Sequence, residues 1–199
     1  MNRSICRVLI TSRPATQLTF KRKISNMWDD PNYITETDKF VFFWRGFMSQ
    51  WYPSMFVVDR IEYNCCEQYM MSEKARMFND VETTEKIMAS KSPKVQKDLG
   101  RQVRGFDPQK WNSDCRDIVW AGNLAKFTQN PELRAKLLAT GDKILVEASP
   151  LDVIWGIGLE ASDKRALNQT EWLGTNWLGE ALMRVRSNIK NLNLIQCDE

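Results

Sequence analysis

The feature of this sequence that most restricts its fold is a series of three prolines, each preceded by a residue that caps helices. The pairs Ser92-Pro93, Asp107-Pro108 and Asn130-Pro131 each place a side-chain oxygen before a first turn that proline is suited to start. Gly105 and Gly141 supply stop signals for the first and third segments. We therefore predict three consecutive helices in the middle of the chain, ending near residues 105, 128 and 141.

Short β-branched and aromatic runs on either side of these helices predict strands at residues 39–44, 55–58, 60–63 and 143–148. A last helix is expected to follow Gly174-Thr175-Asn176. The polar residues 25–39 are expected to form a loosely ordered lead-in, and residues 191–199 a C-terminal tail. The predicted fold class is α+β, with one helix-rich domain around a small β-sheet at residues 40–190.

The first 24 residues differ in composition from the rest of the chain. They contain no acidic residue and six basic ones, Arg3, Arg7, Arg13, Lys21, Arg22 and Lys23. This segment resembles a mitochondrial transit peptide, although a basic tail or a mispredicted start would have the same composition. Without it, 22 basic residues face 25 acidic ones, so charge alone does not indicate a nucleic-acid-binding domain.

Three absences limit the location and the chemistry of the protein. No apolar run approaches the roughly 18–20 residues that cross a bilayer, and the five cysteines form no CxxC pair or disulfide framework. The expected location is therefore intracellular, either cytoplasmic or mitochondrial. The chain has no histidine, which excludes Ser-His-Asp and Cys-His catalysis and most zinc sites. Carboxylates, lysine, tyrosine and cysteine remain for any chemistry.

Residues 64–78 are predicted to form a helix whose apolar face contains two charges. Asn64 is expected to be its N-cap, with Glu67 completing a capping box. At about 100° per residue, Glu67 and Lys74 lie on the same side as Met70, Met71, Ala75, Met77 and Phe78. Because burying an unpaired ion is costly, this face is interpreted as one wall of an active site. A structural Glu–Lys pair at a helix edge is the alternative.

The apolar neighbours of Lys74 would disfavour its ammonium form and free the amine as a nucleophile. Glu67 lies about two turns away along the helix and would move a proton or assist ring opening. Only the long lysine side chain, pointing back toward the helix N-terminus, would bring the two groups together.

Seven motifs in this order resemble one known family: Ser49-Gln50-Trp51-Tyr52-Pro53, Glu67-Gln68-Tyr69-Met70-Met71-Ser72-Glu73-Lys74-Ala75, Lys91-Ser92-Pro93, Leu99-Gly100-Arg101, Leu138-Ala139-Thr140-Gly141-Asp142, Trp155-Gly156-Ile157-Gly158 and Asn176-Trp177-Leu178-Gly179. Together they resemble the NADAR domain (NAD- and ADP-ribose-associated), the YbiA-like N-glycosidases, from roughly Phe40 to Val185.

The resemblance implies cleavage of an N-glycosidic bond on a ribosyl compound. It implies removal of ADP-ribose from guanine bases. The acid and the lysine of the family fall on Glu67 and Lys74, and the implied intermediate is a Schiff base between the lysine and ribose C1″. Hydrolysis of a phosphorylated ribosylaminopyrimidine intermediate of riboflavin synthesis is the alternative reaction. A module that binds ADP-ribose or NAD without catalysis is the alternative of another class.

Four positions depart from the bacterial pattern of this family. Gln68 stands where histidine often follows the acid, and Gln50-Trp51 replace an Asn-Phe pair after Ser49. Ile157 stands where riboflavin-type relatives tend to have aspartate. These differences resemble a eukaryotic or phage-like branch and weaken the transfer of the riboflavin substrate. They leave Glu67 and Lys74 unchanged.

The candidate substrate-binding residues come from two loops and the start of the last helix: Gln50, Trp51, Asp152, Trp155, Gly156, Gly158 and Asn176. Each tryptophan would either stack on a base or pack within its loop. The Gly156-x-Gly158 turn is interpreted as bringing backbone N–H groups to a phosphate or ribose. Asn176 is interpreted either as the cap of the last helix or as a ligand contact.

The expected ligand is ADP-ribosylated guanine, as a nucleotide or in nucleic acid. The basic residues that could neutralise its diphosphate, or could simply be solvated, are Lys91, Lys94, Lys97, Arg101 and Arg104. No cluster has metal-ligand spacing, so we predict an enzyme without a metal or other cofactor. No membrane and no obligate protein partner are expected.

Overall fold

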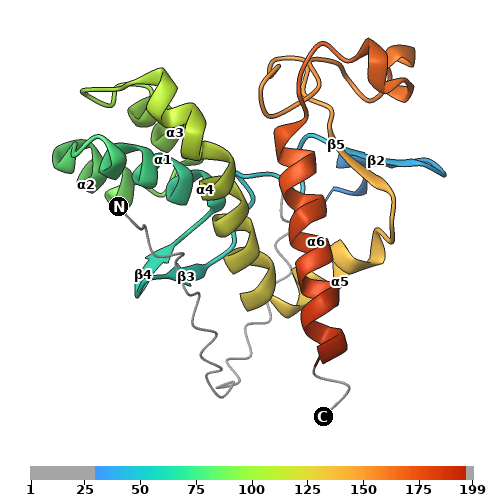
Figure 1. Cartoon of the computed structure of the whole chain (residues 1–199), viewed down its shortest axis with the longest axis horizontal. Helices are drawn as coiled ribbons and strands as arrows, with labels where there is room; N and C mark the ends of the chain where they lie inside the picture. The colour runs from blue at the N-terminus through green and yellow to red at the C-terminus, as the bar shows by residue number, and fades with distance from the viewer. Residues whose placement is uncertain (1–29, 196–199) are drawn as a thin grey trace.

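The computed structural model describes residues 30–195 (Figure 1). Its α-helices are α1 (Cys66–Met77), α2 (Val81–Ala89), α3 (Pro93–Gly100), α4 (Pro108–Gln129), α5 (Pro131–Ala139) and α6 (Trp177–Ile195). Its strands are β1 (Ile34–Glu36), β2 (Phe40–Phe43), β3 (Phe56–Val58), β4 (Ile61–Tyr63) and β5 (Ile144–Glu147). Short 3₁₀ helices lie at Pro31–Tyr33, Lys164–Leu167 and Gln169–Glu171. The α+β prediction is confirmed, and the predictions for residues 1–24 fall outside the described residues.

β2 is the central strand of a three-stranded sheet with the order β1-β2-β5. β1 pairs with it in antiparallel orientation, and β5 pairs in parallel, with Phe43 opposite Glu147. β2 is buried along its whole length because two apolar clusters cover the sheet, one on each face. Since β2 and β5 run in the same direction, they end at the same edge. The loops that leave them, residues 44–55 and 148–158, therefore start side by side.

The lead-in to this sheet differs from the prediction. Residues 34–36 form β1 and pair with β2, so the expected loose order of residues 25–39 is wrong for this part. Ile34-Thr35-Glu36 is too short to show a strand pattern, and pairing with its neighbour decides its conformation. The tail predicted at residues 191–199 also starts too early, because α6 continues to Ile195.

β3 and β4 form a separate hairpin, in which Val58 pairs with Ile61. The two turn residues, Asp59 and Arg60, have φ values of 49° and 68°, as a type I′ turn requires. The two strands and the turn predicted at residues 55–63 are therefore confirmed.

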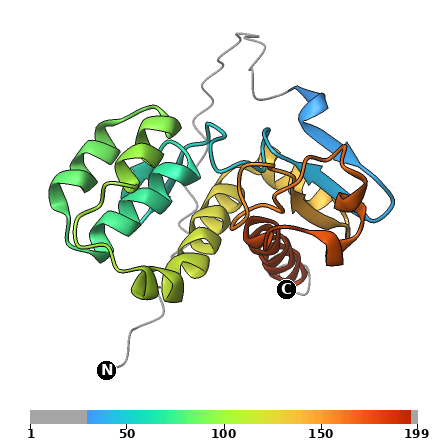
Figure 2. The same ribbon diagram turned by 90° about the horizontal axis from the view of Figure 1, so that it is seen from above.

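The helices form two groups that α4 joins (Figures 1 and 2). α1 contacts α2, α3, α4 and β4, whereas α6 packs against β5, α4 and α5. Figure 2 shows α4 running between the α1–α3 group and the half of the molecule that holds the three-stranded sheet. Both halves therefore pack on one 22-residue helix.

The three proline starts are confirmed, at Pro93, Pro108 and Pro131. The Ser92 and Asp107 side chains accept N–H groups of the first turns, as predicted. The first of these helices, α3, ends at Gly100 and not near Gly105.

Two contacts explain why α3 is short and why Asn130 does not cap with its side chain. After α3, the Arg104 N–H and guanidinium bind the carboxylate of Asp80, which turns the chain away from the helix axis. The Asn130 amide donates to the carbonyls of Met55 and Lys126.

α1 is buried on nearly all sides, which its sequence pattern did not indicate. Gln68 and Ser72, placed on its polar side by the helical wheel, are both buried. The Gln68 amide is nevertheless satisfied, because it donates to the carbonyls of Ile87 and Met88 in the last turn of α2 and of Ser90 just after it.

The predicted capping box at the start of α1 is wrong. Cys65 occupies the N-cap position without a side-chain cap, and the Asn64 amide bonds to Ser90 and Gln96 instead. The Asn64 N–H is bound by the Gln68 side chain and not by Glu67. The Glu67 side chain therefore takes no part in capping α1.

Candidate active site

Glu67 lies in the first turn of α1 with 5% of its surface exposed. Its backbone N–H donates to the carbonyl of Gln50 (3.0 Å), which fixes the start of α1 against the loop after β2. Burial raises the pKa of Glu67 to about 7. The carboxyl therefore changes its protonation state near neutral pH.

Four neighbours adjust this pKa. Lys97, a hydrogen bond from the Trp51 side chain and Arg101 lower it, and Asp152 raises it. Lys97 and Arg101 come from α3, whereas Asp152 comes from the loop after β5. Charged side chains from both halves of the molecule therefore act on the pKa of Glu67.

The loop that contains Gln50 and Trp51 is held by two buried residues of α4. Lys126 is fully buried and its ammonium donates to the Ser49 carbonyl (3.1 Å). Asn123, one turn earlier, donates from Nδ2 to Gln50 Oε1 (2.8 Å). The Gln50 side chain, predicted to bind substrate, is therefore engaged by α4.

Trp51 has a second role beside the aromatic surface predicted for it. Its side chain hydrogen-bonds to Glu67, and the Lys97 ammonium lies 6.0 Å from the centre of its ring. An indole donates but cannot accept a hydrogen bond, so Trp51 favours the charged form of Glu67.

Lys74 is half-buried, and its ammonium lies 4.1 Å from the ring centre of Phe106 and 5.7 Å from that of Trp111. Burial lowers the pKa of Lys74, and the charge of Arg101 lowers this pKa further. Both effects increase the neutral, nucleophilic fraction of the amine. The charge of Arg101 thus acts on both Lys74 and Glu67. The direct approach of the Lys74 side chain to Glu67 stays a prediction.

Glu147 is an acid of this site that sequence reasoning missed. It is the last residue of β5, and its Oε2 atom is shielded from solvent without a hydrogen-bond partner among the described residues. Burial raises the pKa of Glu147 to about 8, with further increases from Asp152 and Glu67 and an opposing effect of Lys97. Lys97 and Asp152 therefore act on both glutamates.

The loop after β5 is organised by Asp152. Its Oδ1 accepts the N–H groups of Ile154 (3.0 Å) and Trp155 (2.8 Å), which closes a tight turn. The carboxylate also raises the pKa values of Glu67 and Glu147. Asp152 therefore adds negative charge near both glutamates, and its contact with a substrate stays a prediction.

The two loop glycines are explained by close packing. A Cβ on Gly156 would lie 2.8 Å from the Glu147 carbonyl oxygen and 2.9 Å from that of Asp152. The N–H groups of Ile157 and Gly158 donate to these same two carbonyls. The first bond holds the turn to β5 and the second closes the loop on itself, whereas the sequence predicted that backbone N–H groups of this turn contact a phosphate or ribose.

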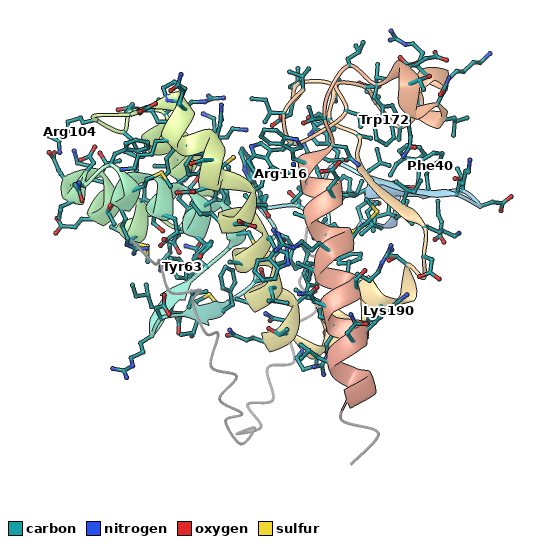
Figure 3. The ribbon with its side chains drawn as sticks, viewed as in Figure 1. Phe40, Tyr63, Arg104, Arg116, Trp172 and Lys190 are labelled. Carbon is teal, nitrogen blue, oxygen red and sulfur yellow. The ribbon has the colours of Figure 1, made fainter. Side chains whose placement is uncertain are left out.

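Trp155 packs against the start of α6. Its ring meets that of Trp177 edge-on, with centroids 5.7 Å apart, and Arg116 of α4 lies 5.3 Å from the Trp177 ring. Figure 3 shows Arg116 in the space between α4 and α6. This contact supports the alternative that Trp155 packs within the structure. The side chain is only half-buried, so part of it stays accessible.

Asn176 holds β5 to α6. Its Oδ1 accepts the Glu147 N–H (2.9 Å) and its Nδ2 donates to the Leu145 carbonyl (2.9 Å). The residue is 2% exposed and has a φ of 56°. The side chain predicted to cap α6 or bind a ligand thus fixes the strand that ends in Glu147.

We expect Asn176→Ala to lower the free energy of unfolding by about 2–4 kcal/mol, because two buried hydrogen bonds are lost and alanine is strained at positive φ. Asn176→Gly removes the same hydrogen bonds without the strain and is expected to be less destabilising by about 1 kcal/mol. Urea unfolding of both variants measures the difference. Equal stability of wild type and Asn176→Gly would contradict the role of the amide.

The basic residues of the α3 region separate into two sets. Lys97 and Arg101 act on Glu67. Arg104 binds Asp80 (2.6 Å) and Glu82, and Figure 3 shows it at the outer edge of the α1–α3 group. Only the first set is placed to meet an anionic substrate at Glu67.

Within residues 30–195, no helix is both long and apolar enough to cross a membrane. In the same range, no three Cys, Asp or Glu side chains are arranged to hold a metal ion. The absence of a cofactor remains a prediction.

Comparison with known proteins assigns this geometry to a family. The NADAR domain model matches residues 42–190, which is most of the chain. The chain belongs to the NADAR domain family. It is 46% identical over 165 residues to the N-glycosidase R617 of Acanthamoeba polyphaga mimivirus, a match that covers 76% of this chain and 96% of that protein.

Two further relatives show the breadth of the NADAR family. The NMR structure of the Escherichia coli protein YbiA superposes with a TM-score of 0.66 at 28% identity, covering 81% of this chain and 91% of YbiA. The riboflavin biosynthesis protein VVA0006 of Vibrio vulnificus is 29% identical over 175 residues, covering 86% of this chain and 43% of that protein. By its relationship to the named N-glycosidases, the chain is a hydrolase of that class.

Two of the positions that depart from the bacterial NADAR pattern have structural roles. Gln68 binds three backbone carbonyls at the end of α2. Ile157 is fully buried in the apolar cluster that covers the second face of the sheet.

Lys126 and Glu147 are the site residues that the sequence concealed. Lys126 lies in a helix where lysine is usually solvated, and only its packing between the Tyr52 and Phe127 rings reveals its burial. Glu147 ends a strand, a position that usually faces solvent. The one available signal was its place next to the loop that contains Asp152.

Proposed function

We propose that this chain removes ADP-ribose from guanine, with Lys74 forming a Schiff base to ribose C1″ and Glu67 moving the proton. The observation that carries the proposal is the burial of Glu67 among Lys97, Arg101 and Asp152. A module that only binds ADP-ribose needs stacking and phosphate contacts, and gains nothing from a buried carboxyl that titrates near neutral pH.

The charges at the site match the charges of the reaction. Breaking a ribosyl C–N bond develops positive charge at C1″ and negative charge on the departing base. Glu67 and Asp152 would stabilise the first, and the amine of Lys74, whose pKa is lowered by burial, would capture it. Lys97 and Arg101 would bind the diphosphate of ADP-ribose beside Glu67.

The alternative substrate is a phosphorylated ribosylaminopyrimidine of riboflavin synthesis. Its support is the relationship to proteins named for riboflavin biosynthesis. The buried Ile157, in place of an aspartate in the loop after β5, favours the guanine substrate.

Incubation with ADP-ribosylated guanosine and, separately, with the ribosylaminopyrimidine phosphate tests the proposal by mass spectrometry of the released base. We expect release of guanosine. Lys97→Met should raise KM for this substrate about tenfold or more, since it removes a charge-assisted contact. Lys94→Met is the matched control, because Lys94 lies on the same helix but pairs with Asp98 at 4.0 Å.

Each other outcome identifies one alternative. Release from the ribosylaminopyrimidine alone would assign the chain to riboflavin synthesis. Tight binding of ADP-ribosylated guanosine without release, equal in wild type and Glu67→Ala, would identify a binding module.

A further inference from the structure

We infer that Glu147 is the general acid of this site and gives its proton to the departing base as the C–N bond breaks. This inference rests on the proposed function. It adds a third catalytic residue to Glu67 and Lys74, and it divides the work of the two glutamates between them.

The position of Glu147 is set by the backbone of the core strand. Its N–H is held by the Asn176 side chain (2.9 Å) and its carbonyl accepts the Ile157 N–H (2.9 Å). It also pairs with Phe43 of β2, whose side chain is 1% exposed. A carboxyl on a strand held at three points keeps its place when a substrate binds.

The surroundings of the Glu147 carboxyl favour its protonated form. Its Oε2 is shielded from solvent and has no donor among the described residues, so an ionised carboxylate there would leave a buried oxygen without a hydrogen bond. Asp152 and Glu67 face it with negative charge, and Lys97 is the cation that opposes them. Burial and these two acids raise the pKa of Glu147 to about 8.

Glu67 has the opposite surroundings. The side chain of Trp51 hydrogen-bonds to it, and both Lys97 and Arg101 favour its charged form. The pKa of Glu67 is raised only to about 7. Two carboxyls whose environments separate their pKa values in this way divide into a base and an acid. The hydrogen bond from Trp51 therefore favours the carboxylate of Glu67, whereas the shielded Oε2 without a donor favours the carboxylic acid of Glu147.

The step balances as follows. The C1″–N bond breaks, its electron pair moves to the base nitrogen, and that nitrogen takes the proton of Glu147. The Lys74 amine forms a bond to C1″ and gives a proton to the Glu67 carboxylate. Glu67 passes this proton to the ribose ring oxygen as the bond from C1″ to that oxygen breaks, which leaves C1″ joined to Lys74 as a Schiff base. Water then adds to C1″ and releases the ribose as its aldehyde, and the two protons of the water return Glu147 and Lys74 to their starting states.

A pair of substrates that differ in their need for a proton tests this role. ADP-ribosylated guanosine is compared with the same compound methylated on guanine N7, whose cationic ring accepts the electron pair without a proton. We expect Glu147→Gln to lower kcat on the first substrate by about 10²- to 10⁴-fold and on the second by less than about tenfold. Equal losses on both substrates, or no loss on either, would overturn the inference.

Controls separate acid catalysis from a folding defect. Glu160→Gln, in an exposed glutamate of the same half of the molecule, should behave as wild type on both substrates. Glu147→Asp keeps the acid and should recover part of the lost kcat on the unmethylated substrate. Thermal unfolding of each variant shows whether it is folded at the assay temperature.

A measurement without substrate keeps the inference separate from the proposed function. Infrared difference spectra of the wild type at pH 7.5 should contain a protonated-carboxyl band that is missing in Glu147→Gln and disappears as the pH rises through about 8. Failure of the wild type to release guanosine would reject the proposed substrate alone. A band that is unchanged by Glu147→Gln would reject the role of Glu147, whatever the substrate is.

Discussion

Replacement of Lys74 by methionine is expected to lower kcat for release of the base by at least about 10³-fold. Methionine keeps an unbranched apolar side chain against Phe106 and Trp111 but has no amine. Sodium borohydride added during turnover should attach the ribosyl compound to the wild type, because it reduces a Schiff base to a stable amine. Peptide mapping should locate the attachment at Lys74, and the variant should form no adduct.

Lys110→Met is the matched control for this experiment. The Lys110 ammonium also lies near an aromatic ring, 5.4 Å from the centre of Phe78, and donates to the Met77 carbonyl. This variant should keep both the activity and the borohydride adduct. Full activity of Lys74→Met, or an adduct at another lysine, would rule out Lys74 as the nucleophile.

Replacement of Glu67 by glutamine is expected to change both the activity and the response of stability to pH. Activity should fall about 10²- to 10³-fold, as for other positioned proton-transfer groups. The wild-type rate should rise with pH through about 7, where Glu67 loses its proton, and this rise should be absent in the residual activity of the variant. The pH dependence of kcat/KM measures both effects.

The effect on stability has the opposite sign to that of a salt-bridged acid. The pKa of Glu67 rises from about 4.3 in the unfolded chain to about 7 on folding, so the folded state binds the extra proton. The wild type therefore loses stability as pH rises from about 4 to 7, by up to roughly 3 kcal/mol from this group. Glu67→Gln lacks this loss and should gain stability over the wild type at pH 8 but not at pH 4.

Urea unfolding at the two pH values measures this difference. Glu62→Gln, at an exposed position of β4, is the matched control and should follow the wild type at both. A Glu67→Gln variant with the same pH response as the wild type would show that Glu67 is ionised without cost in the folded protein.

The helical part of the fold could be predicted because its signals are local. Ser92 and Asp107 cap the turns that follow them, and each proline starts a helix wherever the rest of the chain lies. β1 and the early end of α3 could not be predicted, because β1 depends on pairing with β2 and α3 is ended by the contact of Arg104 with Asp80.

The candidate site also contains residues that the sequence reveals and residues that only the fold reveals. Glu67 and Lys74 stand out because charges on an apolar helix face are visible in the sequence. Glu147 became visible only when β5 was placed beside β2 and the Asp152 loop was folded back on it. The functions of Gln68 and Asn176 were also hidden, since each satisfies backbone groups of an element distant in the sequence.

The raised pKa values of Glu67 and Glu147 have a consequence for a chain without histidine. Near neutral pH, folding draws protons from the solution onto these two carboxyls, and unfolding returns them. The heat absorbed on unfolding therefore includes the heat of protonating the buffer, and it differs between phosphate and Tris. The protein exchanges protons with its surroundings in the pH range usually left to histidine, and it does so with acids held in its interior.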